Sequence, residues 1–565
     1  MDPVLQAFLN SLGPASYDLS LSMVRMCIAY ALSLVFALVY GYFAATNKVA
    51  EKILLPILDI LQSVPILGFF PVVIAVCLNI FTGDAIFGPN LASIILIFTS
   101  MSWNMAFGVY ESVKTLPGEL REVSDSFDVH GWKRLRRLIL PATINRLVYN
   151  SILSWSVGWY FLVSAEIITT GTTNVALTGI GSYLLNYAAT TPLNTGAILA
   201  GIFVLVLLIV AQNFLLWRPL TQWAERYRFD TAPSGEAEVQ GRAPFRRMTG
   251  LVNRAYTAGL SMVGVVRHPL QRLGIRRTGG SIHTSMPGER APKHHRVVEF
   301  FVRYVSLGAI LVAAWLMVIA LGVAIFSLYT QPSNYSPQVL SYMALIPEAL
   351  GLSAFHLVLA YFLALGISIP LALYVFRHAK AARYGLPVIQ IVAAVPATAL
   401  FPLFLFSLKD YIGSDATVVF VLLTGMLWYL FFNILSGLRS IPPDLDEAAR
   451  SMGLKGTKYY RRLVFPAIFS SFVTGSITAL GGGWNTLILA EYINYKTHTF
   501  STLGIGQLID IGTAPVSSGG LGGLGTPGEA LMVAAVLTLV VTVVIVNRVI
   551  WKPLYRLSTD KYRYD

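Results

Sequence analysis

Long apolar runs separated by short polar segments dominate the chain. Runs of about 20 residues have the length of a helix that crosses the apolar core of a bilayer. They predict helices near residues 21–45, 54–80, 90–112, 145–169, 194–219, 299–328, 347–377, 385–408, 415–438, 469–493 and 529–551. Because the runs are continuous rather than alternating, they argue against a membrane β-barrel. The pattern predicts an all-α polytopic membrane protein with about eleven transmembrane helices.

Composition and charge agree with this prediction. The 565 residues are 55% hydrophobic and 12% charged, whereas soluble domains carry about 25% charged residues. The net charge of +13 would suit nucleic acid, but its distribution follows the positive-inside rule. The basic segments are 112–147, 221–298, the loop after 377 and 439–466, and they fall on one side of an eleven-helix path. We therefore predict a multi-pass protein of the cell (inner or plasma) membrane, without nucleic acid, whose N-terminus is outside and whose C-terminus is cytoplasmic.

An internal repeat organises the chain. At a constant offset of 325 residues, Trp103 matches Trp428 and Pro117 matches Pro442. Other matches at this offset are Arg136-Arg137-Leu138 with Arg461-Arg462-Leu463 and Glu166 with Glu491, and upstream the offset becomes 331, as for Pro65 and Pro396. The predicted boundaries are a first repeat at 1–220, a basic cytoplasmic linker at 221–298, an additional helix at 299–328 and a second repeat at 329–565. An odd number of helices in each copy would invert the second, and the additional helix makes the copies parallel. Parallel halves can enclose one central pathway.

A polar motif lies between the third and fourth helix of each copy. The second copy reads Glu447-Ala448-Ala449, then Gly453 and Pro466, and the first reads Glu122-Val123-Ser124, then Asp128 and Pro141. These residues resemble the EAA loop of the permeases of ABC importers. In that family the loop forms a coupling helix that sits in a cleft of an ATPase subunit, so the resemblance implies coupling helices near 118–140 and 443–465. The larger, charged Asp128 at the glycine position speaks against tight docking of the first half, unless Gly131 relieves it by a shifted turn. An amphipathic surface helix without a partner is the alternative.

The resemblance covers most of the chain and is to type I importer permeases. The stretches Trp159 to Glu166 and Trp484 to Glu491, each followed by Gly-Ile-Gly, resemble the nitrate, sulfonate, taurine and bicarbonate branch in a duplicated, fused form. The resemblance implies two ABC ATPase subunits, an extracytoplasmic substrate-binding protein and a small anion as substrate. The chain has no Gly-Lys dipeptide and so no phosphate-binding P-loop. We therefore expect no catalytic or metal site and no bound cofactor here, with ATP and Mg on the partner ATPase.

Candidate pathway residues follow from the same resemblance, because the fourth helix flanks the central cavity in the family. They are Ser154, Trp155, Trp159, Thr478, Trp484 and Asn485, and helix packing explains each about equally well. Arg25 and His356, equivalent at offset 331, would attract an anion, although Arg25 would also fit a side chain that snorkels to the membrane surface. Glu166 and Glu491 are costly in lipid, and pairing with loop backbone explains them better than substrate contact.

Two other classes of protein remain as alternatives. An ion-coupled secondary transporter would need no cytoplasmic partner and usually carries acids in the middle of its helices, whereas the acids here lie near helix ends. A membrane enzyme or redox subunit would need clustered His, Cys or acidic residues at membrane depth, and the sequence has no such cluster.

Overall fold

The computed structural model describes residues 2–63, 65–81, 86–129, 131–172, 177–190, 193–227, 337–495, 498–513 and 528–561. These residues belong to one compact unit that contains both repeats. Most of the predicted linker at 221–298 and the whole additional helix predicted at 299–328 lie outside the described residues.

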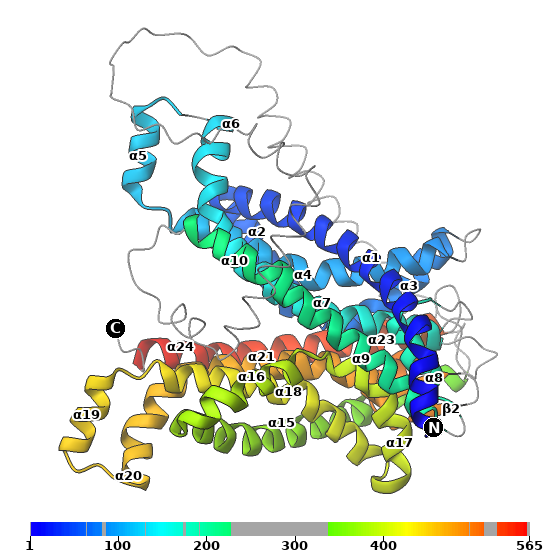
Figure 1. The fold of residues 1–565 in the computed structure, drawn as a ribbon. Helices are drawn as coiled ribbons and strands as arrows, with labels where there is room; N and C mark the ends of the chain where they lie inside the picture. The colour runs from blue at the N-terminus through cyan, green and yellow to red at the C-terminus, as the bar shows by residue number, and fades with distance from the viewer. Residues whose placement is uncertain are drawn as a thin grey trace, which may run out of the picture. The chain divides into compact units, whose positions relative to one another are not determined.

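Repeat one is built almost entirely from helices. Its elements are α1 (Pro3–Thr46), α2 (Lys48–Ser63), α3 (Ile66–Ile80), α4 (Phe87–Lys114), α5 (Gly118–Ser126), α6 (Gly131–Arg134), α7 (Leu140–Thr172), α8 (Ile180–Ala188), α9 (Thr195–Gln212) and α10 (Arg218–Ala224). Figure 1 shows α5 and α6 at one end of this repeat and α8 toward the other.

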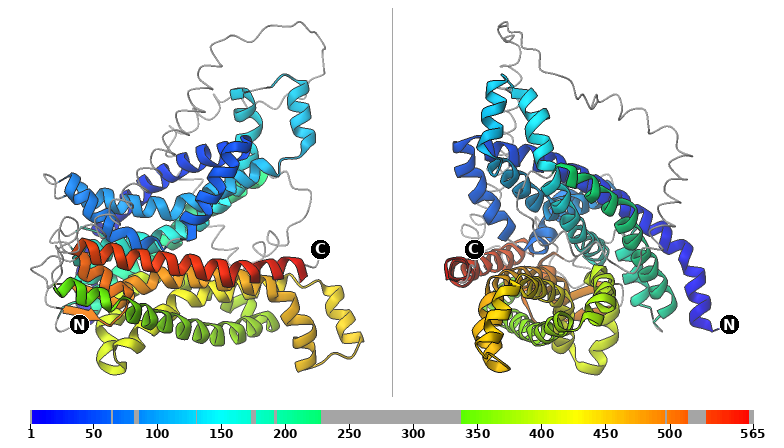
Figure 2. Two further views of the ribbon diagram at one scale, coloured as in Figure 1. Left: turned by 180° about the vertical axis from the view of Figure 1, so that it is seen from behind. Right: turned by 60° about the vertical axis from the view of Figure 1, so that its left-hand side comes forward.

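Repeat two has the same order of elements. They are α14 (Pro337–Ala344), α15 (Ile346–Arg377), α16 (Leu386–Ala394), α17 (Phe401–Ile412), α18 (Ser414–Arg439), α19 (Pro443–Ser451), α20 (Thr457–Tyr459), α21 (Phe465–Glu491), β1 (Tyr492–Tyr495), β2 (His498–Ser501), α22 (Ile505–Thr513), α23 (Gly528–Val546) and α24 (Lys552–Lys561). The antiparallel pair β1–β2 is the exception to the all-helical prediction among the described residues. Helices α19 and α20 lie at one end of the repeat and α17 and β2 at the other, and the views in Figure 2 agree.

The helices confirm an all-α polytopic membrane protein. Within the described residues, eight helices are long and apolar enough to cross a membrane. The bent pair Ala381–Ala394, which includes α16, and Ala397–Ile412, which includes α17, brings the number to nine if it counts as one span. The continuous helices predicted at 54–80 and 385–408 are wrong, because the chain breaks near Pro65 and Pro396, and the second pair is bent by 72°. Proline has no N–H to donate and disfavours helical conformation in the residue before it, which explains both breaks.

The packing of the long helices repeats as well. Helix α4 packs between α1 and α7, and α18 packs between α15 and α21. At one contact the glycine and the asparagine are interchanged between the copies. In repeat one Gly108 of α4 lies against Asn150 of α7, whereas in repeat two Asn433 of α18 lies against Gly475 of α21. These positions correspond at offset 325. A small residue opposite a larger one therefore fills the same space in both copies.

Candidate functional site

The predicted coupling segments each begin with a short helix that ends in the same turn. Residue Asp128 after α5 and residue Gly453 after α19 have positive φ angles of 51° and 74°. In both turns the residue after the positive-φ position donates its backbone N–H to the carbonyl five residues earlier. Val129 donates to Ser124 at 2.9 Å, and Leu454 donates to Ala449 at 3.0 Å. This is the Schellman ending, whose left-handed position favours glycine and tolerates aspartate.

The structure refines the predicted segments. Each is a short helix followed by a turn, after which a second helix begins at Gly131 or Thr457 and continues through a π-helical segment into α7 or α21, rather than one helix over 118–140 or 443–465. Glu122, Val123, Glu447 and Ala448 are exposed, and Ser124 and Ala449 are buried. Pro141 and Pro466 each lie two residues after a π-helical segment, Leu135–Ile139 and Tyr460–Val464, where the regular α-helical bonding is already interrupted.

An apolar tip accompanies each motif, and the sequence reasoning missed it. Phe127 and Met452 stand one residue before the positive-φ position and are 77% and 78% exposed. They are equivalent at offset 325, which is the signal that would have identified them. Each segment thus presents an exposed acid on its short helix and an exposed apolar side chain in the turn that follows the helix.

At the end of α7, Glu166 forms the centre of a buried network that we call the first clasp (Ser22, Arg25, Asn90, Glu166 and the loop at 178–181). Oε1 of Glu166 lies 2.6 Å from Arg25 Nη1 and accepts from the hydroxyl of Ser22 at 2.6 Å, and Oε2 accepts from the N–H of Gly181 at 2.7 Å. Arg25 also donates to Asn90 Oδ1 and to the carbonyl of Thr178. The clasp therefore joins α1, α4 and α7 to the start of α8.

The second clasp has the same plan with two exchanged residues (Ser353, His356, Asp415, Glu491 and the loop at 504–506). Glu491 accepts from the Ser353 hydroxyl at 2.5 Å and from the N–H of Gly506 at 2.8 Å. His356 stands in place of Arg25, with Nδ1 3.8 Å from Glu491 Oε1 and Nε2 3.5 Å from Oδ1 of Asp415. Asp415 corresponds to Asn90 at offset 325.

The clasps explain the Gly-Ile-Gly motif after the fourth helix. A Cβ atom on Gly179 would lie 2.2 Å from Oε1 of Glu166, and one on Gly504 would lie 2.1 Å from the carboxyl carbon of Glu491. The predicted pairing of both glutamates with loop backbone is confirmed. Arg25 does not snorkel, since it is 6% exposed and paired. Arg25 and His356 are not brought together, because each belongs to its own clasp.

The six candidates on the fourth helices have different surroundings. Ser154 and Trp155 bond within their own repeat, to the carbonyl of Met101 at 3.1 Å and to Gln212 Oε1 at 3.0 Å. Trp159 and Trp484 are buried, and Thr478 is exposed and bonded to its own helix.

Asn485 is the candidate that reaches the other repeat. Its Oδ1 accepts from the N–H of Leu67 at the start of α3, at 3.1 Å. In the equivalent contact the repeats are interchanged: the Thr398 hydroxyl of repeat two donates to the carbonyl of Tyr160 in repeat one, at 3.1 Å. Tyr160 corresponds to Asn485 and Leu67 to Thr398, so each broken second span bonds to the same position of the opposite fourth helix. We call these two bonds the crossed contacts.

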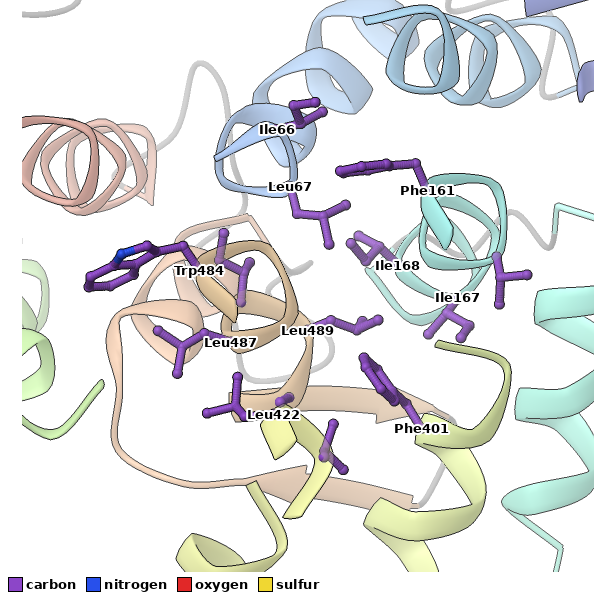
Figure 3. Packing of buried hydrophobic residues seen from close by; sticks show 14 of the residues in the cluster. Ile66, Leu67, Phe161, Ile167, Ile168, Phe401, Leu422, Trp484, Leu487 and Leu489 are labelled. Carbon is purple, nitrogen blue, oxygen red and sulfur yellow. The ribbon is translucent and has the colours of Figure 1, made fainter. Parts of the chain in front are cut away.

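Around the crossed contacts the repeats meet through apolar side chains. Figure 3 shows Leu67 of α3, Ile168 of α7 and Leu489 of α21 converging where these helices approach one another. The hydroxyls of Tyr160 and Thr486 add a third bond between the repeats, at 2.9 Å. The two repeats are therefore joined by three specific polar bonds within an apolar surface, one of which links the two fourth helices directly.

Comparison with known proteins identifies this architecture. The sequence profile of the family described as "binding-protein-dependent transport system inner membrane component" matches residues 37–217 and again 363–550, together more than half of the chain. The nitrate import permease protein NrtB of Leptolyngbya laminosa is 28% identical over 131 residues, 23% of this chain and 44% of that protein.

Two further relatives match in a similar way. The putative aliphatic sulfonates transport permease protein SsuC of Escherichia coli K12 is 35% identical over 121 residues, 21% of this chain and 42% of that protein. The bicarbonate transport system permease protein CmpB of Synechococcus elongatus is 27% identical over 107 residues, 19% of this chain and 37% of that protein. The chain thus spans less than half the length of each of these three relatives.

Proposed function

Because the chain belongs to the family of binding-protein-dependent transport system inner-membrane components, we propose that it is the permease subunit of an ATP-driven ABC importer. Both halves of the permease are fused in this one chain. They form a single pathway across the cell membrane, with the N-terminus outside and the C-terminus in the cytoplasm.

The coupling segments are the observation that carries this proposal. Both repeats present a short exposed helix with an acid, a Schellman turn and an apolar tip, at Phe127 and at Met452. Two such segments suit two ATPase subunits, one for each half. ATP and Mg bind to those subunits, because the chain has no P-loop of its own.

The turn geometry also bears on whether the first half docks. Within this chain a Cβ atom on Gly453 would meet nothing within 4 Å, and its φ of 74° is a left-handed value that favours glycine. Asp128 keeps the same turn at its position. Both coupling helices therefore have the backbone needed to dock, and the difference between them lies in side-chain charge and size.

The proposed substrate is a small anion, delivered by an extracytoplasmic binding protein. Support comes from the names of the relatives, which are permeases for nitrate, aliphatic sulfonates and bicarbonate. The positive charge of Arg25 is already used by Glu166 within the first clasp. Arg25 and His356 therefore do not form an exposed basic pair for the anion, and its passage depends on other groups.

Alternating access would use the crossed contacts. When two ATPases approach each other, they draw both coupling helices together and reorient the halves. Leu67 with Asn485, and Thr398 with Tyr160, are polar bonds between the repeats, and Tyr160 with Thr486 links the fourth helices directly. These are the bonds that separate when the two halves part. The clasps hold each fourth helix to its own repeat, so each half moves as a body.

The test is reconstitution. The chain is purified from its native membrane, the proteins that accompany it are identified by mass, and the assembly is placed in vesicles with the binding protein. We expect a P-loop ATPase at about two copies per chain and uptake of nitrate, an alkylsulfonate or bicarbonate only with ATP. Glu447→Lys should reduce recovery of the ATPase, and Glu348→Lys, at an acid outside the coupling segments, should not. A chain that purifies alone and moves solute on an ion gradient would instead be a secondary transporter.

A further inference from the structure

A small cavity lies between the two repeats, beside the second clasp. Its volume is about 30 Å³, enough for about one water molecule. Ile167 and Ile168 of α7 form one wall, Ile488 and Leu489 of α21 form another, and α3 contributes Pro71. On each fourth helix these residues lie one or two turns beyond the crossed contacts, toward the end where the clasps are. The cavity therefore occupies the space between the closed crossed contacts and the outer face proposed above.

Asp510 of α22 lines this otherwise largely apolar cavity. It is the one carboxylic acid among the described lining residues. The equivalent position of repeat one, at offset 325, is Leu185 in α8, which is buried. The acid thus belongs to one half only, in contrast to the paired glutamates of the clasps, so the architecture common to both repeats does not account for it.

The environment of Asp510 favours its neutral form. Burial raises the pKa of this carboxyl to about 8, although a hydrogen bond with Thr513 lowers it. The titratable groups described on the elements packed against α22 are Glu491 of α21, Cys77 of α3, Glu529 of α23 and Tyr492 of β1, together with Glu348, His356, Tyr361, Tyr374 and Arg377 of α15. Glu491 is held within its clasp by Ser353 and Gly506.

The chemistry of an anion pathway constrains such an acid. An ionised carboxylate in a largely apolar passage repels an anion strongly, because the low dielectric screens the charges little. A protonated carboxyl instead has an O–H that donates a hydrogen bond to an oxyanion. The same side chain is therefore a barrier in one protonation state and a ligand in the other.

We propose that Asp510 is a specificity-determining residue of the transport pathway, which in its neutral form donates a hydrogen bond to an oxyanion as the cavity opens. The inference rests on the anion-importer function proposed above. It assigns the ligand-binding role to one position of repeat two, with no counterpart in repeat one. The ligand class is a small oxyanion that accepts a hydrogen bond from a neutral donor.

The experiment measures ATP-driven nitrate uptake by the reconstituted importer between pH 6.5 and pH 9, with the same pH on both sides. Nitrate is the probe because its charge does not change over this range. We expect uptake by the unsubstituted chain to fall about tenfold between pH 7 and pH 9, as the neutral fraction of a group titrating near 8 falls. Asp510→Asn keeps a neutral donor, so its uptake should persist at pH 9, relative to pH 7. Asp510→Leu removes the donor and should raise the KM for nitrate at both pH values.

The control is Asp410→Asn, which neutralises an exposed acid at the end of α17 in the same repeat. It should leave the pH profile of uptake unchanged. ATP hydrolysis, measured in parallel, separates an effect on the pathway from an effect on the ATPase. Identical pH profiles for the unsubstituted chain and Asp510→Asn would overturn the inference while leaving the importer function intact. Absence of ATP-driven nitrate uptake at every pH, despite a bound ATPase, would overturn nitrate import and the inference with it.

Discussion

Replacing Arg25 by methionine tests the energetic role of the first clasp. The Arg25 guanidinium bonds to Glu166 and to Asn90, each at 2.6 Å, and to the carbonyl of Thr178 at 2.5 Å. Both charged side chains are buried, with exposures of 7% and 0%. Removing one partner of a buried ion pair leaves an uncompensated charge and costs about 3–5 kcal/mol. We expect Arg25→Met to lose about this much stability.

The matched control is His356→Met in the second clasp. There Nδ1 of His356 is 3.8 Å from the Glu491 oxygen, beyond hydrogen-bond distance, and Asp415, its other partner, is largely exposed. Glu491 keeps its bonds from Ser353 and Gly506. The loss should therefore be about 1 kcal/mol or less, although the two positions are equivalent in the repeat.

A double variant makes the reasoning refutable. Arg25→Met combined with Glu166→Gln leaves no buried charge, and the glutamine can still bond to Ser22 and Gly181, so most of the stability should return. The assay is the loss of monodisperse protein on heating the purified chain in detergent, read by size-exclusion chromatography at one fixed heating time, because unfolding of such proteins is often irreversible. A double variant as unstable as Arg25→Met, or an Arg25→Met chain as stable as the parent, would refute the assignment of an energetically important ion pair.

Three further predictions follow from the turns and the clasps. Asp128→Gly should raise the free energy of the opening that allows amide hydrogen exchange in α5 by about 1 kcal/mol, because a left-handed residue with a Cβ is strained. Gly453→Ala should lower the same free energy for α19 by a similar amount. Unchanged exchange rates in both variants would contradict this. Glu447→Lys should weaken ATPase recovery more than Glu122→Lys, and equal losses would remove the proposed asymmetry between the halves. Gly179→Ala should lower the midpoint of thermal unfolding, since its Cβ would lie 2.2 Å from Glu166 Oε1, and a normal midpoint would mean that the loop moves aside freely.

The sequence determined the features that depend on local pattern. The thickness of the bilayer sets the length of an apolar run that can span it, so these runs predicted most of the spans and the class of protein. The constant offset predicted two equivalent halves, and the spacing around Glu122 and Glu447 located both coupling segments. Pro65 and Pro396 were identified as matching residues, but the breaks they cause were missed, because hydropathy is continuous across them.

Only the tertiary structure decided which of these residues meet. Arg25 and Glu166 are 141 positions apart, and Leu67 and Asn485 are 418 apart, so no local period connects them. In a lipid-facing helix hydropathy does not distinguish the face toward lipid from the face toward another helix, because both are apolar. The partners of Arg25, the crossed contacts and the place of Asp510 in a cavity all depend on how the faces of separate helices pack, and the fold alone specifies that packing.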